Sequence, residues 1–386
     1  MAFQDIKIPR FWINILPYIQ KNYGLGTITP FIEHTDSSGN ITIEEDMNLI
    51  NLISLNSRSL YSITPNQNIS SIKLKYIVGS QDLVSGSETQ YDGIEIPDLF
   101  ENINYFYILG HSFSEYGIKA SFKINYYSQG AISSQYLPIN SDFLNCNPTE
   151  DQTSIEPDHD GFTIAESSGF SFESSFIKIE SFEIIFTKKE GDDFTGSEKI
   201  EFSNFGFGTY FDMPHAPELN VSYNKSYDGA KTQKTINGST LTHFNYSSPP
   251  SFGNNGYFEL FDKNRPLPKT TRTGIRSWGL SFKGMTNSTT VGDTSLFPRT
   301  ESYYNFGSDF EDDSFPTNDN IFNENSFFGR VIYPSEGGTI PFIFQADNDN
   351  NNPDQFAVCT FRQKSFKISQ SANKIYTIRT EILESW

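Results

Sequence analysis

The chain has 386 residues, of which 47 are acidic and 28 basic, so that its formal net charge at pH 7 is −19. This charge argues against binding to nucleic acid or to an anionic membrane surface, because both require a dense set of lysines and arginines. No apolar run approaches the roughly 20 residues that a membrane-spanning helix needs, so no membrane insertion is expected. The N-terminus also lacks the long apolar region and small-residue cleavage site of a signal peptide. We expect synthesis in a cytoplasm and a role as a soluble or assembled component.

The composition favours an all-β chain of two domains. Aromatic residues make up 15% of the sequence, with 36 Phe and 20 Tyr, and this excess favours strands over helices. A single core usually stops growing at about 250–300 residues, which a chain of this length exceeds. The two cysteines, Cys146 and Cys359, are too few for a disulfide framework or a zinc site. Each is expected to be a small buried apolar side chain.

Residues 1–30 are predicted to form an N-terminal arm. The sequence leaves three alternatives for this arm, since it could pack on its own domain, dock on a neighbouring subunit or be an ordinary tethered terminus. Apolar residues crowd one side of a short segment that is interrupted at Pro17, and they are Phe11, Trp12, Ile15, Leu16 and Ile19.

Residues 31–212 are predicted to form a β-sandwich of the jelly-roll type. Short segments that alternate between apolar and polar residues are separated here by turn residues. The clearest of these strands are 71–78, 119–126 and 176–186. The alternation of the last one slips around Glu180 and Ser181, which is typical of a β-bulge.

The order of four segments in this region resembles the galactose-binding jelly roll of discoidin-type carbohydrate-binding modules. The segments are 104–112, the strands 119–126 and 176–186, and finally 199–206, in which Ile200, Phe202 and Phe205 precede Gly206. The resemblance rests on apolar spacing and implies a fold more than a ligand. A host surface glycan is the ligand that it would suggest.

A domain boundary is predicted after residue 212. Pro214 and Pro217 lie close together in a segment that fits an extended connector. The second domain would comprise residues 213–386 and begin with a new strand, whose inward positions are expected to be Leu219, Val221 and Tyr223.

Two long loops are predicted in the second domain, at 245–270 and 285–320. The first is rich in proline and glycine, and the second contains the acidic run 309–313. Loops of this length in compact domains often carry function or become ordered against a partner. A short helix is predicted at 325–333, with Phe328, Val331 and Ile332 on one side, before Pro334 ends it.

The stretch from 274 to 386 has the clearest strand pattern. Trp278, Leu280 and Phe282 alternate with small polar residues, so we expect them to be buried on one face of a strand. The segment 356–368 between the first and the last strand is rich in aromatic and β-branched residues. The last strand places four residues on one face, namely Tyr376, Ile378, Thr380 and Ile382.

The order of these elements resembles the phage minor tail and distal tail protein families, over roughly the last half of the chain. Those families carry a strand with Arg, Trp, Leu and Phe at alternate positions, a helix, a Gly-Gly turn and strand, a strand with Cys, and a terminal strand that ends in an aromatic residue. The resemblance implies that residues 213–386 form a tail-tube-like β-sandwich with one short helix. The matching residues are Arg276, Trp278, Leu280 and Phe282, then Gly337, Gly338, Phe342 and Phe344, then Cys359, and finally Tyr376, Ile378 and Trp386.

The same resemblance implies a role as a structural protein of the virion. The chain would form a ring with copies of itself at the tail tip or baseplate and contact other tail or baseplate proteins there. The N-terminal arm and the two long loops are the expected contacts, because ring closure needs a heterologous contact that repeats around the axis. The alternatives are a carbohydrate-binding adhesin or receptor-binding component, and then a glycosidase or a head decoration protein.

No catalytic residue, cofactor or metal site is predicted. The run 110–114 is close to the Gly-x-Ser-x-Gly motif of a nucleophile elbow, with Ser112 as the nucleophile. Ser114 stands where the motif has its second glycine, and no α/β pattern surrounds the run. His111 is therefore expected to be a residue at a strand end or in a turn. No two of the five histidines have the sequence spacing that is typical of metal ligands. They are His34, His111, His159, His215 and His243.

Two oxygen-rich segments and three tyrosines complete the candidates. The segment 158–161 could be a polar rim around a sugar or cation, or a solvated turn. The segment 347–354 lacks the glycine and glutamate of an EF-hand, and a hairpin connection is expected there. Aromatic residues that could stack on a sugar are Tyr126, Tyr127 and Tyr136.

Overall fold

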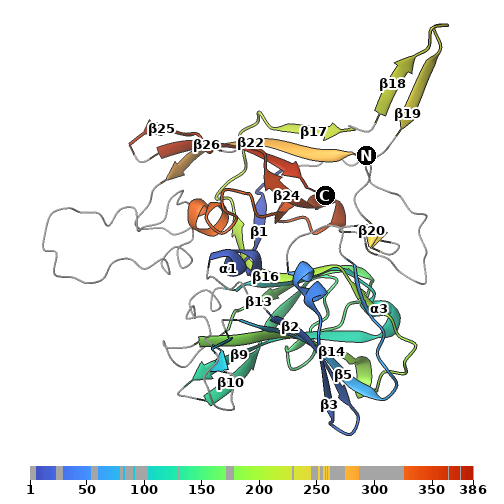
Figure 1. Cartoon of the computed structure of the whole chain (residues 1–386). Helices are drawn as coiled ribbons and strands as arrows, with labels where there is room; N and C mark the ends of the chain where they lie inside the picture. Colours follow the sequence, from blue (N-terminus) through green and yellow to red (C-terminus); the bar gives the residue numbers. More distant parts are fainter. Residues whose placement is uncertain are drawn as a thin grey trace, which may run out of the picture.

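The computed structural model confirms that the chain is an all-β protein, with antiparallel sheets and only short helices (Figure 1). None of the described helices is long and apolar enough to span a membrane. The residues that the structure describes are 6–22, 29–53, 60–78, 81–82, 90–91, 103–128, 131–170, 178–227, 230–244, 251–252, 255–256, 258, 260, 274–286, 326–363, 365–373 and 375–385.

The larger sheet has eleven strands and runs in the order β11-β13-β8-β16-β1-β23-β24-β26-β22-β17, with β25 also paired to β26. Its strands are β1 (Arg10–Asn14), β8 (Tyr105–His111), β11 (Ile139–Leu144), β13 (Gly161–Ser167), β16 (Asn204–Asp212), β17 (Ser222–Ser226), β22 (Ile275–Thr286), β23 (Phe342–Gln345), β24 (Phe356–Phe361), β25 (Ile368–Ala372) and β26 (Ile375–Glu384).

The smaller sheet has seven strands in the order β10-β9-β14-β5-β2-β3, with β12 paired to β9. Its strands are β2 (Thr29–Asp36), β3 (Ile41–Glu45), β5 (Ile69–Ile77), β9 (Ile118–Ser128), β10 (Ala131–Tyr136), β12 (Ser154–Ile155) and β14 (Lys178–Lys188).

Within the described parts of the chain, four two-stranded pairs and six short helices complete the elements. The pairs join β4 (Tyr61–Ile63) with β15 (Ile200–Phe202), β6 (Gln81–Asp82) with β7 (Gln90–Tyr91), β18 (Ala230–Lys234) with β19 (Thr240–Phe244), and β20 (Ser251–Phe252) with β21 (Asn255–Gly256). The helices are α1 (Leu16–Asn22), η1 (Met47–Leu52), α3 (Phe113–Tyr116), η2 (Lys189–Gly191), the π-helix η5 (Phe328–Ile332) and η6 (Pro353–Gln355).

The strands predicted at 71–78, 119–126 and 176–186 are confirmed as β5, β9 and β14. Their alternation matches burial, since Ala120, Phe122 and Ile124 of β9 all lie in the core. The predicted bulge is also confirmed, because the register of β14 against β9 shifts between Ile179 and Ser181. The apolar periodicity therefore locates these strands correctly along the chain.

The seven-stranded sheet packs against the β8 and β16 part of the larger sheet. A cluster of buried side chains from both sheets fills the space between them, and the ring centroids of Phe122 and Phe207 are 4.5 Å apart across it. We call it the first cluster. Its aromatic members are Tyr76, Phe106, Phe113, Phe122, Phe170, Phe182, Phe186, Phe194, Phe202, Phe205 and Phe207.

The N-terminal arm packs on the chain itself, as a central strand of the larger sheet. β1 pairs with β16 on one edge, where Arg10 lies opposite Asp212, and with β23 on the other, where Arg10 lies opposite Gln345. The approach to β16 is close, since a Cβ on Gly208 would overlap the carbonyl oxygen of Ile13. One sheet thus runs past the boundary predicted at residue 213, and the division into two domains stays a prediction.

Described residues between Gly274 and the end of β26 form most of the core at the other end of the sheet. As predicted, Trp278, Leu280 and Phe282 are buried, and the predicted helix is confirmed as the π-helix η5. We call this core the second cluster. Its members are Phe11, Ile13, Phe211, Met213, Trp278, Leu280, Phe282, Met285, Phe327, Val331, Ile332, Phe342, Phe344, Ala346, Ala357, Cys359, Phe361, Ile378 and Ile382.

Strands β1, β8 and β23 also contribute to a third cluster, which lies on the face opposite to the side chains that they place in the first and second clusters. Phe258 and Leu260 pack here, and both belong to the first predicted long loop. Most of that loop, like the loop at 285–320 with its acidic run 309–313, lies outside the described residues. The buried members of the third cluster are Trp12, Tyr105, Tyr107, Leu109, Leu144, Phe162, Ile164, Phe258, Ile343, Phe356 and Val358.

The burial predicted for the strand after the boundary is wrong for Leu219 and Tyr223, whereas Val221 is half-buried and packs against the second cluster. Leu219 precedes β17 and is fully exposed, and all five residues of β17 are exposed as well, including Tyr223. The reason lies in the position of β17 at the end of the sheet order, where it pairs with β22 alone. Alternation in an edge strand need not reflect a core.

Both cysteines are buried, as predicted, and we expect neither to react in the native protein. Burial raises the pKa of the Cys359 thiol well above its usual value, which suppresses the reactive thiolate. Ellman's reagent should label Cys146 and Cys359 at least about 100-fold more slowly than a cysteine introduced at the exposed Ser369, because reaction requires local opening. Fast native labelling of either cysteine would contradict the packing.

Candidate functional site

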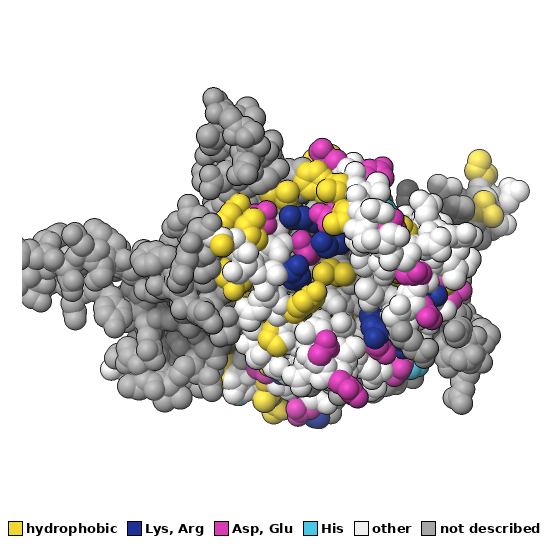
Figure 2. Space-filling view, turned by 90° about the horizontal axis from the view of Figure 1, so that it is seen from below, with side chains coloured by type: hydrophobic (Ala, Val, Ile, Leu, Met, Phe, Trp, Pro, Cys, Tyr) yellow, Lys and Arg dark blue, Asp and Glu magenta, His cyan; other side chains and the backbone are white. Residues whose placement is uncertain are grey.

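Charged and polar side chains gather on the outer face of the seven-stranded sheet. The inward positions of β9 are Ala120, Phe122 and Ile124, so Lys123 and Asn125 point away from the core. Figure 2 views the molecule from this side and shows basic and acidic side chains close together, with apolar side chains at their margin. We call this surface the lysine–glutamate face. It comprises Glu33, Lys73, Lys75, Lys123, Asn125, Tyr136, Glu180, Ser181 and Glu183.

Glu183 lies at the centre of this face and is only 3% exposed. Its Oε2 lies 3.4 Å from the Nζ of Lys123 and 3.8 Å from the Nζ of Lys73. Its Oε1 accepts a hydrogen bond of 2.7 Å from the side-chain amide of Asn125. The register brings these groups together, because Glu183 lies opposite Lys123 on one neighbouring strand and Lys75 on the other.

Two further carboxylates surround this centre. Glu180 accepts a hydrogen bond of 3.0 Å from Ser181 Oγ, and its Oε1 lies 3.7 Å from the Nζ of Lys75. Glu33 accepts a hydrogen bond of 2.8 Å from Lys73. Burial alone would lower the pKa of Lys73, but the bond to Glu33 and the charge of Glu183 outweigh burial and raise it. Lys73 therefore stays charged near neutral pH.

An exposed aromatic ring borders the charges. Tyr136 on β10 is exposed, and the Nζ of Lys123 lies 5.9 Å from the centre of its ring. An aromatic ring beside carboxylate, amide and ammonium groups offers stacking together with hydrogen-bond donors and acceptors. Three lysines and three glutamates also balance in charge. The face is therefore suited to a neutral, hydroxyl-rich ligand better than to an ion.

The structure places the three predicted tyrosines differently. Tyr136 borders the lysine–glutamate face, whereas Tyr126 packs against the first cluster and is not available for stacking. Tyr127 is half-buried. The sequence did not single out Glu183 or Asn125, because their proximity depends on the pairing of strands that lie far apart in the chain.

The near match to a nucleophile elbow is a structural turn. Ser112 Oγ donates to the carbonyl oxygen of Lys199 at 2.9 Å and accepts from the backbone N–H of Glu201 at 3.0 Å. His111 is the last residue of β8, which confirms the predicted strand end. It is buried, and its Nε2 lies 2.9 Å from Thr163 Oγ1. Both side chains thus join neighbouring segments of the fold. Among the hydrogen bonds of the described residues, none links Ser112 Oγ to the imidazole of His111.

We expect His111 to make the protein less stable as the pH falls. Burial lowers the pKa of His111 from 6.5 to about 3, although a bond with the backbone of Phe162 opposes this. The unfolded chain takes up a proton below pH 6.5, and the native chain does not until about pH 3. Stability should therefore fall across this window, by up to about 1.4 kcal/mol per pH unit.

Urea denaturation between pH 6.5 and 3 would measure this effect. The His111→Gln variant should show a shallower pH dependence than the wild type, and His159→Gln, a half-buried turn residue, should keep the wild-type slope. Parallel curves for His111→Gln and the wild type would show that the buried imidazole is not the cause.

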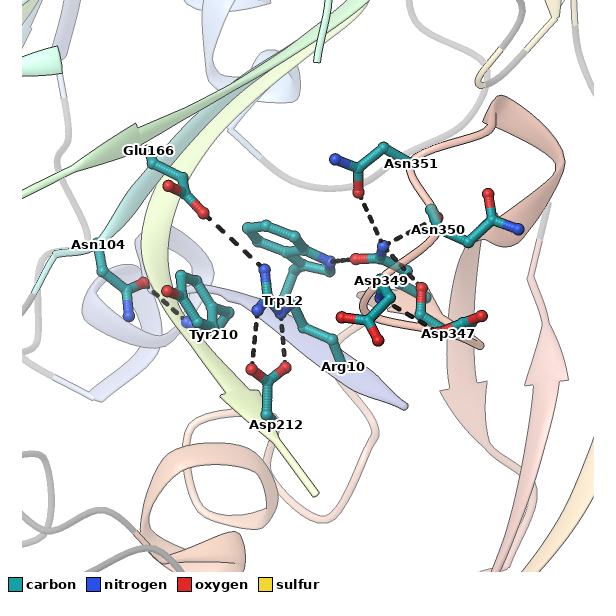
Figure 3. A network of polar contacts seen from close by, with 11 residues as sticks. Arg10, Trp12, Asn104, Glu166, Tyr210, Asp212, Asp347, Asp349, Asn350 and Asn351 are labelled. Carbon is teal, nitrogen blue, oxygen red and sulfur yellow. Dashed lines mark hydrogen bonds and ion pairs between the residues drawn. The ribbon is translucent and has the colours of Figure 1, made fainter. Parts of the chain in front are cut away.

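The segment 347–354 is confirmed as the connection of the β23–β24 hairpin. Its polar groups bond within the chain, as Figure 3 shows, since the side-chain amide of Gln345 donates to the carbonyl oxygens of Asp347 and Asn350. Asp347 also forms an ion pair of 3.3 Å with Lys7. Among the described residues, no group of three or more His, Cys, Asp or Glu side chains could hold a metal ion.

The segment 158–161 is a turn held to its surroundings. Asp160 is buried and accepts a hydrogen bond of 3.1 Å from the backbone N–H of Glu115. The carbonyl oxygen of Asp158 accepts from Ser114 Oγ at 2.6 Å, and the backbone N–H of His159 donates to Asn145 at 2.8 Å. These bonds favour the predicted turn over a sugar or cation rim.

Figure 3 also shows how β1 is fixed between β16 and β23. The guanidinium of Arg10 donates two hydrogen bonds to Asp212, of 2.6 and 2.8 Å, and lies 4.1 Å from the centre of the Tyr210 ring. On the other edge, Trp12 Nε1 donates to Gln345 at 3.2 Å. These contacts hold the two ends of the large sheet together.

Comparison of the chain with models of protein families, with curated proteins and with solved structures gives no match.

Proposed function

We propose that the chain is a structural protein of a phage virion, located in the tail tip or baseplate, with an assembling role and no catalytic one. Residues 213–386 would assemble with copies of the chain into a ring and contact other tail or baseplate proteins. The seven-stranded sheet would face outward.

The observation that supports this proposal is the packing of the residues that carry the resemblance to phage tail proteins. Nearly all of the apolar residues that carry this resemblance pack in the second cluster, although they come from four strands. They are Trp278, Leu280 and Phe282 of β22, Phe342 and Phe344 of β23, Cys359 of β24 and Ile378 of β26. The sequence pattern is thus one packed unit, in which each short motif depends on the others.

Two polar features of the pattern also have structural roles. Arg276 forms a buried ion pair with Glu384, with a distance of 2.9 Å between Nη2 and Oε1. Gly338 has a φ of +80°, and a Cβ there would overlap the ring of Phe361. The second glycine of the Gly-Gly turn is therefore required by this packing, and the arginine before the tryptophan joins β22 to β26.

Localisation in the particle tests the proposal. In virions of a phage that encodes this chain, mass spectrometry should detect the protein, and tails separated from heads should retain it. A gold label on a cysteine introduced at Ser369 should appear at the tail tip in electron micrographs. Absence from the virion, or recovery with the heads, would rule out the tail assignment.

The lysine–glutamate face favours a second function, the binding of a host surface glycan. Within this face, Lys123 contacts both the exposed Tyr136 ring and the buried Glu183 carboxylate. Binding of the full chain to host polysaccharides should weaken at least about tenfold in Tyr136→Ala, because stacking on the ring is lost. The control Tyr227→Ala removes an exposed tyrosine elsewhere and should bind as the wild type does. Equal binding by both variants would exclude this face.

A further inference from the structure

The hairpin of β18 and β19 projects from the body of the protein (Figure 1). Every described side chain from Thr232 to Thr242 is exposed, except the half-buried Thr235. Two of these exposed side chains are large and apolar. They are Ile236 at the tip, which is 105% exposed, and Leu241, which is 59% exposed. A two-stranded hairpin alone is marginally stable in water, so a partner that covers these residues would stabilise it.

The hairpin is basic, although the whole chain is strongly acidic. Residues 230–244 contain Lys231, Lys234 and His243 and no Asp or Glu, whereas the chain carries a net charge of −19. Such a segment is attracted to acidic surfaces, and the chain itself offers these in excess.

The free edge of β3 has the complementary properties. β3 is the last strand in the order of the seven-stranded sheet, and within the described residues no strand pairs with its outer edge. All five of its residues are exposed, with Ile41 at 57% and Ile43 at 60%. Residues 29–53 contain five acidic residues and no Lys or Arg, and the acidic residues are Glu33, Asp36, Glu44, Glu45 and Asp46.

We infer that the β18–β19 hairpin of one copy of this chain binds along the edge strand β3 of a second copy. An edge strand presents unpaired N–H and C=O groups that can pair with an added strand. Ile41 and Ile43 would cover the apolar residues of the hairpin, and its lysines would lie near Glu44 and Glu45. The basic hairpin and the acidic segment 29–53 are complementary in charge, so we infer that the partner of the hairpin is a second copy of the chain.

The two surfaces lie at opposite ends of the protein in Figure 1, so one copy does not satisfy its own hairpin. A contact between two different surfaces of identical chains is heterologous, and it repeats until it closes a ring or extends a filament. The inference rests on the proposed ring assembly. It adds to the contact of residues 213–386 the edge strand β3, so the edge of the seven-stranded sheet meets the next copy while its outer face stays free.

Charge reversal tests the inference on the full chain. Sedimentation velocity should show oligomers for the wild type that dissociate as NaCl is raised, because the contact is partly ionic. Self-association should weaken at least about tenfold in Lys231→Glu/Lys234→Glu and also in Glu44→Lys/Glu45→Lys, since like charges would then meet. Combining all four substitutions in one chain should restore self-association, because the two surfaces then carry opposite charges again. The control Arg362→Glu/Lys367→Glu makes the same charge change at exposed residues elsewhere and should assemble as the wild type does.

Cross-linking shows whether the two surfaces meet. In a chain that carries Ile43→Cys and Leu241→Cys, a bismaleimide should produce a ladder of covalent oligomers, and either cysteine alone should produce dimers at most. A monomeric wild type, unchanged assembly in both charge-reversed variants, or no ladder would overturn the inference. If the protein is found in tails but the ladder is absent, this contact is wrong and the tail assignment stands. If the ladder forms but virions lack the protein, the tail assignment falls instead.

Discussion

Replacing Trp278 by alanine is expected to lower the free energy of unfolding by about 3–5 kcal/mol. Trp278 is almost fully buried, and its ring centroid lies 5.1 Å from that of Phe344 in the second cluster. The guanidinium of Arg276 lies 5.3 Å from the same ring. Loss of the indole would therefore leave a cavity between β22 and β23 and remove a contact of a buried cation. Urea denaturation followed by far-UV circular dichroism measures the change.

The matched control is Tyr223→Ala. Tyr223 contacts the same indole, with ring centroids 5.9 Å apart, but its side chain is exposed on the edge strand β17. Its loss should cost less than about 1 kcal/mol, since little area is removed from the core. Equal effects of the two substitutions would mean that the indole is not packed as described.

Replacing Glu384 by alanine is expected to cost a similar amount, about 3–5 kcal/mol, because it leaves a buried arginine without its counter-charge. Glu384 accepts hydrogen bonds from the Nε and Nη2 of Arg276, at 3.1 and 2.9 Å, and from its backbone N–H at 2.9 Å. Burial would lower the pKa of Arg276, but the bond to Glu384 raises it, so the guanidinium stays charged. The same denaturation experiment measures the loss.

The same strand supplies the control. Glu381 lies 3.9 Å from Arg362, and both side chains are largely exposed. Solvent screens this pair, so Glu381→Ala should cost less than about 1 kcal/mol. The double variant Arg276→Met/Glu384→Leu should recover part of the stability that Glu384→Ala loses, since no buried charge remains. No recovery would indicate that hydrogen-bond geometry, rather than the unpaired charge, causes the loss.

The apolar periodicity predicted the half-buried strands well and the fully buried one poorly. β9 and β22 alternate because one face meets the core and the other does not. β1 is buried at all five positions, so it has no alternation to detect, and its place between β16 and β23 was not predicted. The exposed edge strand β17 shows the opposite error, because Leu219 before it and Tyr223 within it follow the alternating pattern but are exposed.

The charged sites were harder to predict than the strands, because they depend on register between distant segments. Arg276 and Glu384 are 108 residues apart in the sequence, and Asn125 and Glu183 are 58 apart. Nothing local distinguishes Glu183 from the other acidic residues of the chain. Only the pairing of β14 with β9 and β5 surrounds it with lysines.

The central position of β1 has a consequence for synthesis of the protein. Trp12 bonds with Gln345, which follows it by 333 residues. Ribosomes add about 5–20 residues per second, so roughly 20–70 s pass between the synthesis of these two residues. During this time one edge of an apolar strand has no partner, and the strand is open to pairing with other nascent chains. The amount of active protein made in a cell should therefore depend on chaperones that bind the emerging N-terminal segment until β23 arrives.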